Sequence, residues 1–116
     1  MTRNIFQKII DREIPAPLVY EDEHCAAFND INPQAPIHIL VIPKGAYVSW
    51  DDFSAKASEA EIAGFIRAVG HVAREQEMVA PGYRLLANAG IDSHQEVPHL
   101  HVHLFGGKAL GPMLMR

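Results

Sequence analysis

The chain has 116 residues, 48% of them hydrophobic, which is enough for one compact domain with a core and leaves little room for a second. Its 10 Lys and Arg against 14 Asp and Glu give a net charge of −4, so no general attraction to nucleic acid or to an anionic membrane is expected. Cys25 is the single cysteine, which excludes an internal disulfide and a cysteine-based zinc site. Together with the lack of a signal-like or membrane-spanning apolar stretch, this predicts a cytoplasmic protein.

The first half of the chain predicts a short helix followed by three strands. Apolar residues recur at helical spacing after Asn4, a good N-cap residue: Ile5, Phe6, Ile9 and Ile10. Residues 18–20 and 25–28 are expected to pair as a hairpin around the polar turn 21–23. Residues 30–36 contain two prolines and predict a rigid loop, and residues 37–43 form an almost wholly apolar strand whose one polar member is His38.

The second half predicts one long helix and two further strands. Residues 44–58 show no regular pattern, and then Ser58 with Glu61 gives a capping-box signature for an amphipathic helix over about 59–77. Residues 83–87 and 97–105 predict the last two strands. We therefore expect an α+β domain with two helices and a five-stranded, mainly antiparallel sheet, because the short connections leave no room for crossover helices.

Three histidines alternate with apolar residues in the last predicted strand. In an extended strand, His99, His101 and His103 would share one face, and the residues between them would pack on the other. The pattern suits either a metal site or nucleophilic catalysis, in which one imidazole attacks phosphorus; a merely solvated face is the third interpretation. The middle residue, His101, is the natural nucleophile, and the shortage of nearby carboxylate or cysteine ligands weakens the metal interpretation.

The segment His99-Leu100-His101-Val102-His103-Leu104-Phe105 resembles the signature of the histidine triad (HIT) superfamily. Further segments, including those around residues 5–10, 28–38 and 88–90, resemble its Hint branch, the purine nucleoside phosphoramidases. The resemblance implies a single HIT domain over residues 1–116, with sheets joined across a homodimer. It implies hydrolysis of purine nucleoside 5′-phosphoramidates through a nucleotidyl-histidine intermediate, with no metal or other cofactor.

The resemblance also assigns roles to individual residues. His101 matches the nucleophile, and the backbone carbonyl of His99 would orient its ring. His103 and His38 match positions that contact the phosphate and assist the leaving group. Asp30 matches a carboxylate that binds the ribose, and Asn88 matches an amide that binds the phosphate. An apolar base pocket is implied at Ile31, Phe28, Phe6 and Ile9, and Gln95 is a further implied nucleotide-binding residue.

Two questions stay open at the level of sequence. A dimeric nucleotide-binding or partner-binding module with weak or incidental hydrolase activity is the alternative to the enzyme, although binding alone would not require His101. Glu96, just before the histidines, would repel a phosphate if it pointed at one. It is expected either to swing to solvent or to face the leaving group and favour a cationic amine.

Overall fold

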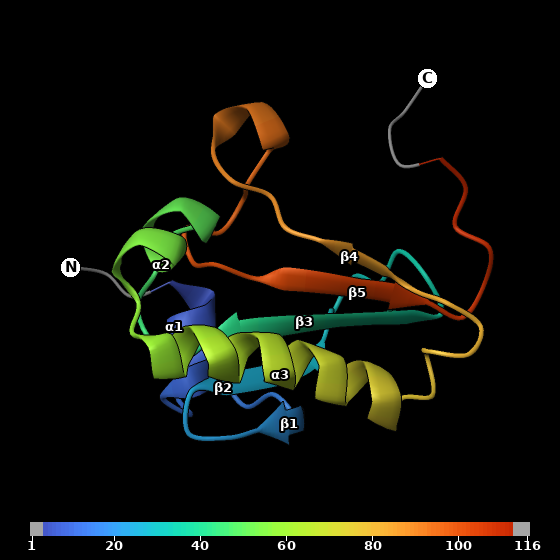
Figure 1. Ribbon diagram of the computed structural model, residues 1–116, viewed down its shortest axis with the longest axis horizontal. Coiled ribbons are helices and arrows are strands. Elements are labelled where there is room, and N and C mark those ends of the chain that lie inside the picture. The colour runs from blue at the N-terminus through green and yellow to red at the C-terminus, as the bar shows by residue number, and fades with distance from the viewer. Residues whose placement is uncertain (1–3, 113–116) are drawn as a thin grey trace.

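In the computed structural model (Figure 1), the described residues form a five-stranded antiparallel sheet with three α-helices. The structure describes residues 4–112; the ends of the predicted domain, residues 1–3 and 113–116, lie outside the described part. The elements are α1 (Ile5–Ile10), β1 (Leu18–Glu21), β2 (Cys25–Asn29), β3 (Ile37–Pro43), α2 (Trp50–Lys56), α3 (Glu59–Glu75), β4 (Arg84–Leu86) and β5 (Val102–Gly106), with a 3₁₀ turn at Ile91–Ser93. The strand order is β1-β2-β3-β5-β4, which confirms the predicted α+β class.

The predicted helix starts are confirmed by their caps. The Asn4 side chain accepts a hydrogen bond from the backbone N–H of Gln7 at 2.8 Å, and the Ser58 hydroxyl accepts one from Glu61 N–H at 3.1 Å. The Glu61 carboxylate in turn accepts a hydrogen bond from the Ser58 N–H at 3.0 Å. Each cap satisfies donors that the first turn of a helix leaves unpaired, so the local sequence alone fixes where α1 and α3 begin.

The prediction of two helices was wrong, because α2 occupies part of the segment for which no element was expected. Ser49 is its N-cap, and the Asp52 carboxylate accepts hydrogen bonds from the backbone N–H groups of Val48 and Ser49 at 2.8 and 2.7 Å. Only Phe53 of this helix is buried. A seven-residue helix with one apolar anchor has too few periodic positions to be recognised, and its stability comes from packing against the rest of the molecule.

The two faces of the sheet pack against different helices. Alternate residues of β3 point to opposite faces: Ile39 and Val41 join the core under α3, whereas Leu40 and Ile42 join a smaller cluster with Phe6 of α1. In Figure 1, α3 runs along the sheet and α1 is a single short helix near one end of the strands. Among the described residues, no helix covers much of the α1 face over β3, β5 and β4.

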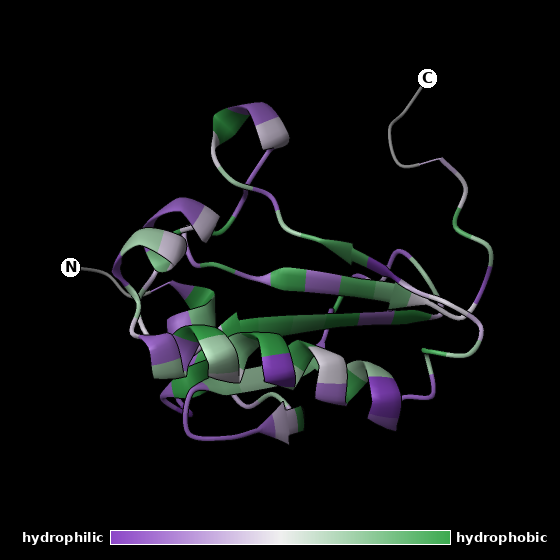
Figure 2. Ribbon diagram, in the orientation of Figure 1, coloured by the Kyte–Doolittle hydropathy of each residue, from purple (hydrophilic) through white to green (hydrophobic). Residues whose placement is uncertain are grey.

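The last strand is shorter than predicted. β5 begins at Val102, and residues 97–101 approach it as an irregular segment in which the Leu100 N–H donates to the Tyr47 carbonyl at 2.8 Å. The alternation nevertheless continues through this segment, because Leu100, Val102 and Leu104 are all buried in the core under α3. Figure 2 shows the resulting alternation of hydrophilic and hydrophobic bands along β5. None of the described helices is long and apolar enough to cross a membrane.

Candidate active site

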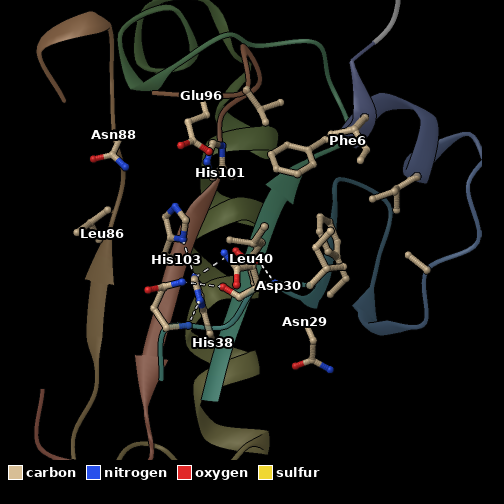
Figure 3. Close-up of a pocket in the computed structure, with 18 of the residues that line it drawn as sticks. Phe6, Asn29, Asp30, His38, Leu40, Leu86, Asn88, Glu96, His101 and His103 are labelled. Atoms are coloured by element: carbon tan, nitrogen blue, oxygen red, sulfur yellow. Dashed lines mark hydrogen bonds and ion pairs between the residues drawn. The ribbon is translucent and has the colours of Figure 1, made fainter. Parts of the chain in front are cut away.

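A cavity of about 1070 Å³ opens on the α1 face of the sheet. Cross-strand pairing explains which side chains reach it: Leu40 of β3, His103 of β5 and Leu86 of β4 stand in one row across the sheet, and His38 pairs with Phe105 in the next row on the same face. His101, Asn88 and Glu96 reach the cavity from the segments that lead out of β4 and into β5. Figure 3 shows these side chains converging from several elements.

His101 is held by its own backbone neighbourhood. Its Nδ1–H donates to the carbonyl oxygen of His99 at 2.7 Å, so the neutral ring presents the lone pair of Nε2. The Phe6 ring meets the His101 ring edge to face, with centroids 4.9 Å apart, and limits its rotation. A fixed imidazole with one free lone pair in a cavity is the arrangement that a histidine nucleophile requires.

Hydrogen bonds fix the tautomers of His38 and His103. The backbone N–H of Gln34 donates to His38 Nδ1 at 3.1 Å, so the proton of neutral His38 must be on Nε2. That Nε2–H faces His103 Nδ1 at 2.8 Å and donates to it, which leaves the proton of His103 on its own Nε2. His103 is thereby prepared as a donor, whereas His101 is prepared as a lone-pair acceptor or nucleophile.

Burial keeps these histidines neutral. Desolvation lowers the pKa of His103 to about 4, with smaller contributions from the neighbouring histidines. Desolvation also lowers the pKa of His38, against the opposing effect of the Asp30 carboxylate, and lowers that of His99. At neutral pH these three rings are therefore uncharged, and His103 offers its Nε2–H donor to the cavity without a positive charge.

Asp30 lies at the other end of the histidine group. Its Oδ1 accepts the backbone N–H of Asn32 at 2.8 Å, and its Oδ2 lies 3.5 Å from His38 Nε2. The carboxylate keeps free lone pairs that face the cavity, which suits a ligand with adjacent hydroxyl groups.

One end of the cavity is apolar. Phe6, Ile9, Phe28 and Leu40 are buried there and line the wall, with the Phe6 and Phe28 rings 5.6 Å apart. Ile31 is 95% exposed and lies at the opening. An apolar wall of this kind accommodates a flat aromatic ligand group.

Two of the predicted site residues do not line the cavity. The His99 ring is buried and donates from Nε2 to the carbonyl oxygen of Pro43 at 2.8 Å, so its side chain does not share the open face with His101 and His103 as predicted. The physical reason is that the regular strand begins only at Val102. The side-chain amide of Gln95 instead joins three backbone groups: it donates to Val48 and Val97 carbonyls at 2.6 and 3.0 Å and accepts from Gly90 N–H at 3.0 Å.

Several residues with evident roles escaped the sequence analysis. The backbone of Gln34 sets the His38 tautomer, and the Phe105 ring packs on those of His38 and His103, with centroids 4.3 and 5.5 Å away. Backbone donors carry no sequence signal. Leu40 and Phe105 could have been found, because each lies two residues from a candidate histidine on the same strand face.

The site could also hold a metal ion. Asp30, His38 and His103 each offer one ligand atom, and those three atoms lie within 4.8 Å of one another. A carboxylate with two imidazoles is a donor set that transition metals accept.

Comparisons with known proteins place the chain among HIT proteins. Residues 11–110 match the family model of the HIT domain. The chain is 63% identical to an uncharacterised 13.2 kDa HIT-like protein from Azospirillum brasilense, over 97% of this chain and 93% of that protein. It is 46% identical to the purine nucleoside phosphoramidase of Escherichia coli K12, over 95% of this chain and 92% of the relative. A HIT family hydrolase from Legionella pneumophila superimposes with a TM-score of 0.86 at 38% identity, over 94% of this chain and 96% of that one.

Proposed function

The chain belongs to the HIT domain family, as a nucleotide hydrolase of that fold, and we propose that its substrates are purine nucleoside 5′-phosphoramidates. The observation that carries this proposal is the pair of fixed rings, His101 with a free Nε2 lone pair and His103 with an Nε2–H donor. The 46% identity to a purine nucleoside phosphoramidase supports the substrate class.

The cavity suits each part of such a substrate. The purine would lie against the apolar wall at Phe6 and Phe28, and the ribose hydroxyls would donate to Asp30. The phosphoryl group would then lie near His101, with the Nε2–H of His103 and the Asn88 amide available as donors. These donors stabilise the negative charge on the phosphoryl oxygens during displacement.

The reaction proceeds in two displacements. The Nε2 lone pair of His101 forms a bond to phosphorus while the P–N bond to the amine breaks, and the departing nitrogen takes up one proton relayed from solvent. Water then attacks phosphorus, the bond to His101 breaks, and one proton returns to solvent. The products are the nucleoside monophosphate and the free amine, and two moderate barriers replace one large one.

Mass spectrometry after rapid quench with an adenosine phosphoramidate tests this mechanism. We expect an adenylyl adduct on the peptide that contains His101. In His101→Asn we expect the adduct to vanish and kcat to fall at least about 10³-fold, while adenosine monophosphate still binds. Turnover by His101→Asn within tenfold of the unmodified protein would contradict the mechanism.

A metal-dependent hydrolase is the second candidate, and the grouping of Asp30, His38 and His103 favours it. In that mechanism these residues would hold the ion, which would polarise the phosphoryl oxygen. Dialysis against a chelator separates the two candidates. The metal candidate predicts loss of activity and its recovery on adding zinc, whereas the nucleophilic mechanism predicts no change.

We further propose that the protein is a homodimer joined through α3 and β4. β4 is an edge strand, and beside it a groove of about 320 Å³ is lined by exposed apolar side chains, among them Trp50, Ile66 and Leu85. An apolar groove next to an unpaired strand edge suits a second copy that continues the sheet.

Light scattering after size exclusion tests the dimer. We expect Leu85→Glu, in the groove, to shift the mass from about twice that of the chain to that of one chain. Val79→Glu is the matched control, because Val79 is exposed to a similar degree but does not line the groove. A single-chain mass for the unmodified protein would contradict the dimer.

A further inference from the structure

Glu96 lines the cavity close to the histidines, yet the proposed reaction gives it no role. Its side chain is 78% exposed, and in Figure 3 it lies toward the His101 end of the histidine group, at the opposite end from Asp30. The ribose and base therefore would lie on one side of the reacting phosphorus and Glu96 on the other. Glu96 faces the part of the cavity that is left for the leaving group.

The neighbouring residues keep Glu96 at this wall. Gln95 is tied to the backbone at Val48 and Gly90, so the chain is anchored directly before Glu96. Val97, directly after it, also lines the cavity and packs against the cluster beneath α1. Among residues 4–112, the one ionisable neighbour that an ion pair links to Glu96 is His94, whose Nε2 lies 3.4 Å from Glu96 Oε1. Both side chains are largely exposed, so this contact leaves the carboxylate available to a ligand.

The charged side chains that line the cavity bear on which substrates it favours. Among the described residues, no Lys or Arg lines it. The carboxylates of Asp30 and Glu96 both line it, and the His94 side chain lines it beside Glu96. A negative phosphoryl group is repelled by the Glu96 carboxylate, whereas a substrate whose amine carries a second, positive group brings a charge that this carboxylate attracts.

We propose that Glu96 is a specificity-determining residue that selects leaving amines bearing a second, cationic ammonium group. This inference rests on the proposed phosphoramidase function and names the class of amine for that site. The carboxylate binds the remote ammonium group and takes no part in the P–N bond cleavage. Because the carboxylate and the ammonium group would meet at the partly solvated rim of the cavity, their attraction contributes modestly to kcat/KM and depends on ionic strength.

Two matched substrates test the proposal: adenosine 5′-phosphoramidates of 1,4-diaminobutane and of n-pentylamine, which differ in whether the amine ends in an ammonium or a methyl group. We expect the unmodified protein to prefer the cationic substrate by about fivefold in kcat/KM at low salt, and less at high salt. Glu96→Gln, which keeps the shape and removes the charge, should bring the ratio close to one. Glu23→Gln is the control, because Glu23 is exposed and does not line the cavity.

The outcomes separate the inference from the function on which it rests. Turnover of both substrates with the same ratio in the unmodified protein and in Glu96→Gln would overturn the role of Glu96 and leave the phosphoramidase proposal standing. A similar loss for both substrates in Glu96→Gln, with the ratio kept, would also overturn it, since that pattern indicates a structural role. Absence of turnover and of the His101 adduct with either substrate would refute the proposed function itself.

Discussion

The same strands supply both faces of the sheet, but one face is a packed core and the other lines a cavity. Under α3, Leu100, Val102 and Leu104 are buried among apolar side chains, and none of them lines the active-site cavity. On the other face, His101 and His103 line a cavity that α1 covers only in part. Because alternate residues of one segment serve both faces, the rigidity of the packed face positions the groups on the open face. The comparison predicts that substitutions on the two faces affect different quantities.

The largest expected effect comes from breaking the packed face. Phe65 on α3 is 1% exposed in the main core, and Phe65→Ala should lower the free energy of unfolding by about 4 kcal/mol, because it removes buried apolar area and leaves a cavity. Urea unfolding measures this loss. Leu86→Ala on the open face is the counterpart. We expect it to lower the free energy of unfolding by about 1 kcal/mol or less but to raise KM, since Leu86 lines the cavity. Equal stability losses for the two variants would refute the contrast.

A smaller effect concerns the buried, neutral histidines of the open face. The folded-state pKa of His103 is about 4, below its ordinary value of 6.5, and the pKa values of His38 and His99 are also lowered. Between pH 4 and pH 6.5 the unfolded chain binds more protons than the folded protein does. The part of the free energy of unfolding that comes from these neutral histidines is therefore fully present above about pH 6.5 and is lost as the pH falls toward 4. We expect a loss of about 2 kcal/mol by this route.

Urea unfolding at pH 7.0, 6.0 and 5.0 measures that dependence, in a range where most carboxylates stay ionised. His103→Gln should flatten the slope, because it removes the most strongly shifted group. An unchanged slope in His103→Gln would show that the pH dependence comes from elsewhere.

The smallest effect is expected at the loop that bounds the open face. Gln95→Ala removes the hydrogen bonds to Val48, Gly90 and Val97, and should cost about 1 kcal/mol of stability. Because the loop carries Glu96 and follows Asn88, kcat/KM should fall about tenfold. Gln76→Ala, at the exposed end of α3, is the control. A raised KM with unchanged kcat and stability would instead favour direct nucleotide contact by Gln95, as the sequence predicted.

Much of the fold followed from local patterns. The Asn4 and Ser58 caps gave the starts of α1 and α3, and alternation along residues 99–105 separated the core residues from His101 and His103. These features involve residues within a few positions of one another, so periodicity and capping rules reach them. The short helix α2 was not found, since one buried Phe53 gives no period.

By itself, the sequence determined the class of the fold, the helix caps and the alternation that separates His101 and His103 from the core residues, because each depends on neighbours along the chain. Only the tertiary structure decided how those histidines work together. The β3–β5 register brings His38 to His103, although they are 65 residues apart, and the Gln34 N–H then sets both tautomers. Likewise, residues 95–100 pack on residues 43–48, so that the His99 ring donates to the Pro43 carbonyl and the Gln95 amide donates to the Val48 carbonyl. Contacts between distant segments depend on how the whole chain packs, and no local pattern encodes them.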